Sequence, residues 1–163
     1  MKVYKTVKDY VNHREAEGDD SEIYTTCGGF DPLHIGHLRC ILETAEMAKT
    51  DNAKAVIVVN GDGFLTRKKG RPFMKEGERA EIISGLRGVD AVVIWDDGTQ
   101  NCIGAIELLR PSLFTKGGDR AAPEDIAEWD VCNRIGCRVQ FNVGGGKIQS
   151  SSWLTGQKNE ENK

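Results

Sequence analysis

The stretch from Tyr24 to His37 constrains the fold of this chain more than any other. An apolar and β-branched run predicts a buried strand, and Gly28 and Gly29 then allow a sharp turn because neither carries a Cβ atom. A helix is expected to begin directly after the turn, at its histidines. A buried strand that passes through a glycine turn into a helix is typical of an α/β fold.

The start of that predicted helix is suited to binding an anion. Its first backbone N–H groups have no partner within the helix, and the helix dipole places partial positive charge there. His34 and His37 are three residues apart, so both side chains lie on one face of the first turn. Two imidazoles above a set of amide donors predict a site for an oxygen-rich polyanion, namely a nucleotide phosphate.

Strands and helices alternate along the rest of the chain. Hydrophobic patterning predicts strands at residues 22–26, 53–60, 89–95, 112–115 and 138–143. It predicts helices at residues 35–49, 76–86, 101–109 and 123–133, the third capped by Thr99 and a last short one capped by serines. This order predicts a Rossmann-like, three-layer α/β/α fold with a five-stranded parallel sheet, whose ligands bind beyond the carboxyl ends of the strands.

The length of 163 residues fits one domain with a substantial core. We expect that domain to cover residues 21–156, with a polar, frayed tail at 157–163. Residues 1–20 form an extension, in which Val3, Val7 and Val11 are spaced like one stripe of a helix. A short helix packed on the domain and a mobile tail both fit this extension.

Charge and cysteine content exclude several classes of protein. A net charge of -3 and a pI near 5.7 argue against a general nucleic-acid or membrane binder. The chain has no long apolar run and no signal-peptide pattern, so a cytoplasmic location is expected. The 5 cysteines are odd in number and lack CxxC spacing, which predicts free thiols rather than disulfides or a zinc site.

A basic segment follows the predicted strand at 53–60. The sequence Gly61-Asp62-Gly63 predicts a turn, and a loop with Arg67, Lys68, Lys69 and Arg71 comes after it. Two interpretations stay open. The cations either clamp the phosphates of the substrates or form an ordinary solvated run of charge.

Residues 26–37 fit the pattern Thr-x-Gly-x-Phe-Asp-x-x-His-x-Gly-His. This pattern resembles the signature of the HxGH nucleotidyltransferase superfamily, which is cytidylyltransferase-like. The run from Gln149 to Ser152 resembles the second signature of that superfamily, and the likeness extends from about Ile23 to Leu154. The segment Lys116-Gly117-Gly118-Asp119 resembles the heptose 1-phosphate adenylyltransferase branch in particular. Glycerol-3-phosphate cytidylyltransferases lack that segment and have an arginine where this chain has Gly145.

The resemblance implies a role for each matched residue. Catalysis would rest on His34, His37 and Lys68, and no protein ligand for a metal is predicted. The nucleotide would be bound by Thr26, Gly28, Gly29, Phe30, His34, Gly36, His37, Lys116, Gly117, Asp119, Ser150, Ser151 and Ser152. The acceptor and the phosphates would be bound by Asp31, Asp62, Lys68, Lys69, Arg71 and Arg79.

Several of these residues also have plain structural interpretations. Asp31 either lies beside the phosphate and metal region or stabilises a turn, and Arg79 either reaches the phosphates or pairs with a carboxylate. The three serines either hold phosphate oxygens or simply cap a helix, and the Lys-Gly-Gly-Asp segment is a nucleotide contact or a plain turn. Trp153 either stacks on a base or packs on the protein.

The predicted activity is therefore transfer of a nucleoside monophosphate, AMP from ATP, to a phosphorylated sugar such as heptose 1-phosphate, with release of pyrophosphate. Mg²⁺ is expected to enter bound to the nucleoside triphosphate. One alternative is a cytidylyltransferase acting on glycerol 3-phosphate or a similar polyol phosphate. Another is a nucleotide-binding regulatory protein without turnover. The expected partners are small molecules, with no nucleic acid or membrane, and the resemblance implies a homodimer.

Overall fold

The fold is centred on a parallel sheet in which β2 (Ile23–Gly28) is an inner strand. The structure is a computed structural model and describes residues 2–118, 122–146 and 149–156. The other strands are β1 (Val3–Tyr4), β3 (Lys54–Asn60), β4 (Ala91–Trp95), β5 (Leu113–Thr115) and β6 (Arg138–Gln140). Their order is β1-β4-β3-β2-β5-β6, and every neighbouring pair is parallel.

The prediction of a Rossmann-like α/β fold with a parallel sheet is confirmed, but the predicted count of five strands is wrong. The described residues form a six-stranded sheet, because Val3 and Tyr4 pair with Val92 and Val93 of β4. Val3 therefore lies in a strand and not on the helical stripe that its spacing predicted. The helical part of the extension is α1 (Val7–Glu17), which is capped by Thr6 at its start and by Gly18 at its end.

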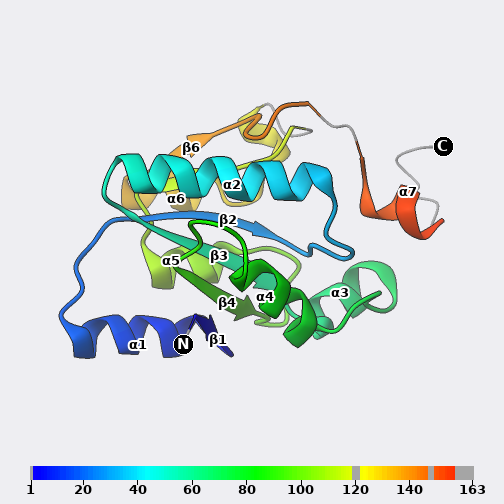
Figure 1. Cartoon of the computed structure of the whole chain (residues 1–163), viewed down its shortest axis with the longest axis horizontal. Coiled ribbons are helices and arrows are strands. Elements are labelled where there is room, and N and C mark those ends of the chain that lie inside the picture. Colours follow the sequence, from blue (N-terminus) through cyan, green and yellow to red (C-terminus); the bar gives the residue numbers. More distant parts are fainter. Residues whose placement is uncertain (1, 119–121, 147–148, 157–163) are drawn as a thin grey trace.

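Helices cover both faces of the sheet (Figure 1). The helices are α2 (Ile35–Thr50), α3 (Asp62–Lys69), α4 (Glu76–Ser84), α5 (Ile103–Leu109), α6 (Trp129–Ile135) and α7 (Ser151–Thr155), with a 3-10 turn at Pro123–Asp125. Val56 and Val58 pack with residues of α1 and α5 on one face, whereas Ile57 and Val59 pack with α2 and α4 on the other. This alternation along β3 is what a strand buried on both sides requires.

Two further predicted segments differ from the structure. Residues 62–69 form the helix α3 instead of a turn and basic loop, because Phe64 and Leu65 are buried against the domain. The single helix predicted at 123–133 is a 3-10 turn followed by α6, which begins only at Trp129.

The position of β2 fixes where a ligand can bind. The chain runs from β2 outward through β3 to β4, and then crosses back to β5 on the other side of β2. The carboxyl end of β2 is therefore the point at which the strand order reverses. In open parallel sheets, ligands bind in the crevice outside such a point.

Candidate active site

The loop between β2 and α2 carries both histidines of the predicted signature. His34 is the N-cap of α2, and its Nδ1 accepts a hydrogen bond from the Gly36 N–H at 3.1 Å. The Nδ1 of His37 accepts from the His34 N–H at 3.3 Å. Since both Nδ1 atoms accept, each neutral ring carries its proton on Nε2, and Nε2–H is the donor that each imidazole presents.

The two imidazole rings are held by stacking. Their centroids lie 3.7 Å apart with an angle of 23° between the planes. The His37 ring also packs against the buried ring of Phe30 in a T-shaped arrangement, with centroids 5.1 Å apart at 87°. Phe30 therefore serves to orient the His37 ring, a role that the sequence pattern did not reveal.

Glycine is required in this loop by close packing. A Cβ atom at Gly28 would lie 2.9 Å from the Phe30 ring, and one at Gly36 would lie 3.0 Å from the His34 ring. Both glycines thus let an aromatic ring of the site approach the backbone. The protein's own packing therefore explains why the signature has glycine at these two positions, whether or not a ligand also approaches the backbone there.

Asp31 is buried and is bound entirely by the protein in this structure. Its carboxylate accepts from the N–H groups of Phe73 and Met74 at 2.6 Å each, and it pairs with Lys69 at 2.7 Å. Burial alone would raise the pKa of Asp31, but the Lys69 ammonium and the two N–H groups outweigh it and lower the pKa below the usual value. The carboxylate therefore ties the histidine loop to the segment between α3 and α4.

Arg79 is the second link between these segments. It is 1% exposed, and its guanidinium donates to the carbonyl oxygens of Gly29 at 2.8 Å and Asn60 at 2.6 Å. It also pairs with the Asp62 carboxylate at 2.7 Å. Of the two interpretations open for Arg79, the structure shows pairing with a carboxylate, so Arg79 and Asp62 hold the backbone around the site.

The serines near the end of the described chain meet the histidine loop. Ser151 Oγ donates to the carbonyl oxygen of Pro32 at 2.8 Å, although the two residues are 119 positions apart. Ser150 caps α7, since its Oγ accepts from the Trp153 N–H at 3.1 Å, and it lies 3.1 Å from the Ser152 hydroxyl. The structure thus brings the two predicted signatures to the same edge of the sheet, with the Trp153 side chain 54% exposed beside them.

The Lys-Gly-Gly-Asp segment follows β5 on the other side of β2. The Lys116 carbonyl accepts from the Val143 N–H at 2.9 Å, and a Cβ atom at Gly118 would lie only 2.1 Å from the Gly145 carbonyl oxygen. Lys116 and Gly117 are partly exposed at the sheet edge. The predicted contribution of Asp119 lies outside the described residues.

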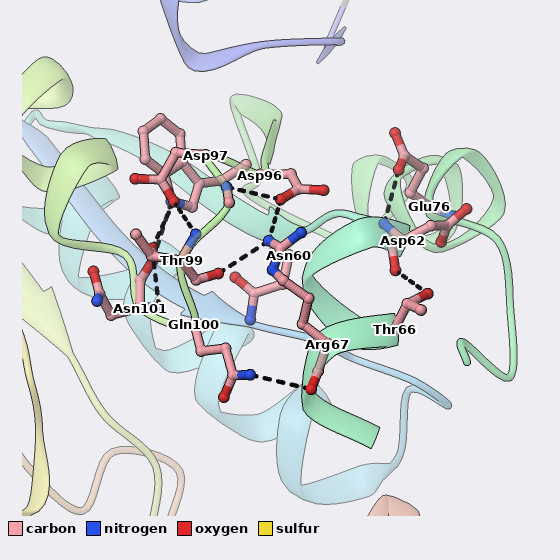
Figure 2. A network of polar contacts seen from close by, with 12 residues as sticks. Asn60, Asp62, Thr66, Arg67, Glu76, Asp96, Asp97, Thr99, Gln100 and Asn101 are labelled. Carbon is pink, nitrogen blue, oxygen red and sulfur yellow. Dashed lines mark hydrogen bonds and ion pairs between the residues drawn. The ribbon is translucent and has the colours of Figure 1, made fainter. Parts of the chain in front are cut away.

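Two basic residues of the predicted clamp bind acidic groups of the protein. Arg67 donates to the Asp96 carboxylate and to the Thr99 carbonyl at 3.0 Å (Figure 2), and Lys69 pairs with Asp31. Lys68 and Arg71 are exposed at the end of α3 and just beyond it. The hydroxyl of Thr26, also predicted to contact nucleotide, is buried and donates to the Thr115 carbonyl at 3.0 Å within the sheet.

Several residues at this edge were not predicted to belong to the site. They are Asn60, Asp96 and Gln100, which end β3 or follow β4. Their positions after buried strands were the available signal, because the carboxyl ends of parallel strands share one edge. Their hydrogen-bond partners come from other elements and could not be read from the chain.

The acidic groups of the site offer little to a metal ion. Asp31 and Asp62 already accept hydrogen bonds and ion pairs from the protein. Within the described ranges, no three His, Cys, Asp or Glu side chains are grouped as metal ligands. In the same described part of the chain, every helix is too short or too polar to span a bilayer.

Comparison with known proteins identifies the family. The cytidylyltransferase-like family matches residues 25–139. The bifunctional protein HldE of Geobacter metallireducens is 38% identical over 122 residues, which are 74% of this chain and 24% of that protein. HldE of Hyphomonas neptunium is 41% identical over 116 residues, 70% of this chain and 22% of that protein. This chain thus spans about a quarter of the length of these relatives.

Solved structures share the fold. The lipopolysaccharide core biosynthesis protein of Thermoplasma volcanium superposes with a TM-score of 0.60 at 25% identity, covering 78% of this chain and 99% of that one. The pantoate-beta-alanine ligase of Francisella tularensis, at 14% identity and a TM-score of 0.65 over 95% of this chain and 73% of that one, shares the fold alone. The match over residues 25–139 shows that this chain belongs to the cytidylyltransferase-like family of nucleotidyltransferases, as the signature predicted.

Proposed function

We propose that this protein transfers AMP from ATP to a phosphorylated sugar such as heptose 1-phosphate and releases pyrophosphate. The observation that carries the proposal is the hydrogen bond between Ser151 and Pro32, which joins the serines to the histidine loop. A triphosphate at this edge would meet hydroxyl and imidazole donors together. The similarity to HldE and to a lipopolysaccharide core biosynthesis protein favours a sugar phosphate as the acceptor.

The reaction is an in-line displacement at the α-phosphorus. A phosphate oxygen of the acceptor forms a bond to the α-phosphorus, and the bond from that phosphorus to the bridging oxygen of the β-phosphate breaks. Pyrophosphate leaves with the electron pair. Such transfers need positioning and charge stabilisation more than covalent help from the protein.

Each group of the site has a part in this displacement. The Nε2–H groups of His34 and His37 donate to phosphate oxygens whose negative charge increases in the transition state. The hydroxyls of Ser150 and Ser152 hold the β- and γ-phosphates, and Lys68 orients the acceptor phosphate and pyrophosphate. Mg²⁺, entering as part of the triphosphate substrate, neutralises phosphate charge. We also propose a homodimer.

The direct test measures pyrophosphate release from each of ATP, CTP, GTP and UTP with heptose 1-phosphate or glycerol 3-phosphate as acceptor. Release with ATP and heptose 1-phosphate is expected. Release only with CTP and glycerol 3-phosphate would replace this proposal by a cytidylyltransferase. Nucleotide binding with no release from any pair would indicate a regulatory protein.

Replacement of His37 tests the mechanism. His37→Ala removes a transition-state donor, so kcat should fall by roughly a hundredfold or more. His13→Ala is the matched control, because His13 lies on α1 and packs on the Tyr4 ring. It should release pyrophosphate at the wild-type rate. An unchanged rate in His37→Ala would rule out the assigned role.

A further inference from the structure

The carboxyl end of β3 holds a buried side chain whose amide nitrogen has no hydrogen-bond partner among the described residues. Asn60 is 6% exposed. Its Oδ1 accepts a hydrogen bond from the Cys102 thiol at 3.3 Å, and its backbone carbonyl accepts from Arg79. Among residues 2–118, 122–146 and 149–156, Nδ2 has no hydrogen-bond partner. Asn60 Nδ2 is therefore a donor that the described part of the protein leaves available.

The thiol fixes which way the Asn60 amide faces. Because Oδ1 is held by Cys102, Nδ2 points away from that thiol. Within the described part of the chain, the one fully buried side-chain nitrogen or oxygen without a partner is Arg14 Nη1. Nδ2 of Asn60 is therefore in reach of solvent, although the side chain as a whole is buried.

Asn60 lies directly beside the loop that carries the histidines. Val59, the preceding residue, is in register with Gly28 at the end of β2. One guanidinium nitrogen of Arg79 donates to both the Gly29 and the Asn60 carbonyl oxygens, at 2.8 and 2.6 Å. The amide thus belongs to the β3–β4 side of the site, whereas Lys116 follows β5 on the opposite side of β2.

Two segments fixed to each other surround this amide. Arg67 of α3 reaches Asp96 and the Thr99 carbonyl after β4, and Gln100 Nε2 donates back to the Arg67 carbonyl at 3.1 Å. Figure 2 shows the Asn60 carboxamide between the Arg67 side chain and the loop that carries Thr99 and Gln100. These contacts hold α3 and the loop after β4 in place on either side of the Asn60 carboxamide.

We propose that Asn60 binds a hydroxyl group of the acceptor, so that this part of the site selects polyhydroxylated phosphates. A hydroxyl oxygen accepts hydrogen bonds, and Nδ2 of Asn60 supplies a donor for it. This inference rests on the proposed function, because it takes the acceptor to lie beside the histidine loop. It adds to that function a neutral subsite for the sugar or polyol.

Charge favours a hydroxyl here over a phosphate. The adjoining loop carries the carboxylates of Asp96 and Asp97, and the former pairs with Arg67. Burial of Asp96 is outweighed by its hydrogen bond from Arg67 and by the Gly98 N–H, which lower its pKa and keep it charged. The carboxamide itself is neutral, and the Arg67 charge beside it is already paired with Asp96, so this place offers hydrogen bonds rather than an unpaired positive charge.

Binding tests the subsite without any turnover. In ¹⁵N-labelled protein, the Asn60 side-chain amide resonances should shift on addition of heptose 1-phosphate or glycerol 3-phosphate. They should stay in place with n-propyl phosphate, which has the chain of glycerol 3-phosphate but none of its hydroxyls. Equal shifts with all three phosphates, or no shift with any, would overturn the subsite.

A pair of variants tests its effect on catalysis. Asn60→Asp keeps an oxygen that accepts from the Cys102 thiol but removes the Nδ2–H donor. The control is Asn101→Asp, which adds the same charge to the neighbouring loop and keeps the oxygen that accepts from the Ile103 N–H. In Asn60→Asp, KM for the acceptor should rise about tenfold, as loss of one hydrogen bond predicts. KM for ATP should change by less than about twofold, and Asn101→Asp should resemble wild type.

The outcomes separate this inference from the function on which it rests. A rise in both KM values, or in neither, would show that Asn60 is structural and would overturn the subsite. Absence of pyrophosphate release with every substrate pair would refute the nucleotidyl transfer instead. The amide resonances would then still decide whether a hydroxyl binds at Asn60.

Discussion

Asp31 holds two loops together through three interactions with one carboxylate. Lys69 and the N–H groups of Phe73 and Met74 all contact it, and the side chain is 2% exposed. Removing one partner of a buried ion pair leaves the other charge without compensation. The stability of the site loop should therefore depend on this carboxylate being ionised.

Asp31→Asn should lower the free energy of unfolding by about 3 kcal/mol at pH 7. The pKa of Asp31 is lowered in the folded state, so its contribution is full above the ordinary carboxyl pKa and is lost as pH falls through the folded value. Urea unfolding of wild type and variant across pH 7 to 3 should show the difference shrinking at the acid end.

Asp20→Asn, at an exposed aspartate, is the control for this measurement and should stay within about 0.5 kcal/mol of wild type. A difference between wild type and Asp31→Asn that does not change with pH would contradict an ionic role for Asp31.

Among the elements, the segment after β5 and the loop before α7 pack backbone against backbone. A Cβ atom at Gly118 would meet the Gly145 carbonyl at 2.1 Å, whereas one at Gly117 would meet nothing within 4 Å. This contact sets how the Lys-Gly-Gly-Asp segment sits at the sheet edge. Gly117 and Gly118 therefore provide a matched pair of substitutions, one at an open position and one at a closely packed position.

Gly118→Ala should lower the melting temperature by several degrees, since the clash costs about 1–3 kcal/mol. Gly117→Ala should melt within about 2 °C of wild type, because a change of under 0.5 kcal/mol is expected at an open position. Differential scanning calorimetry on both variants measures this. Equal melting temperatures would mean that the two segments do not pack in this way.

The elements also show where sequence patterns succeed. The strand β3 and the helix α2 were predicted because each has a long, regular apolar pattern that its burial confirms. The helix α3 was missed because Gly61 and Gly63 are typical of a turn, and the Asp62–Glu76 hydrogen bonds that fix its start join distant residues. The strand β1 has 2 residues, too few for any periodicity, and is defined only by pairing with β4.

The same distinction applies to the candidate site. The histidine loop follows from its local signature, and its helix start is where the pattern placed it. By residue type, Asp31, Asp62 and Arg79 could each bind a substrate. In the structure they form ion pairs within the protein instead, Asp31 with Lys69 and Asp62 with Arg79. Asn60 follows a buried strand, which places it at this edge, but which of its polar atoms remains for a ligand depends on tertiary partners.

For the whole molecule, α1 completes one side of the core. Tyr10 is 5% exposed and packs in the cluster that includes Val58 and Val93 of the sheet. Residues 7–17 therefore cover one face of the sheet, and weakening this contact should lower the stability of the whole domain.

Tyr10→Ala should destabilise the protein by about 3 kcal/mol, as expected for removing a buried aromatic ring. Asn12→Ala, at an exposed position on the same helix, should change stability by less than about 0.5 kcal/mol. Chemical denaturation of both variants gives the comparison. A Tyr10→Ala variant as stable as wild type would mean that α1 contributes nothing to the core.

The bond between Ser151 and Pro32 has a consequence for synthesis in the cell. The histidine loop is synthesised before its serine partner, which follows 119 residues later. A nascent chain can thus form its sheet while the serine side of the proposed phosphate site is still missing. On this proposal, competence to hold a triphosphate would arise only once Ser151 has been added and has reached the Pro32 carbonyl.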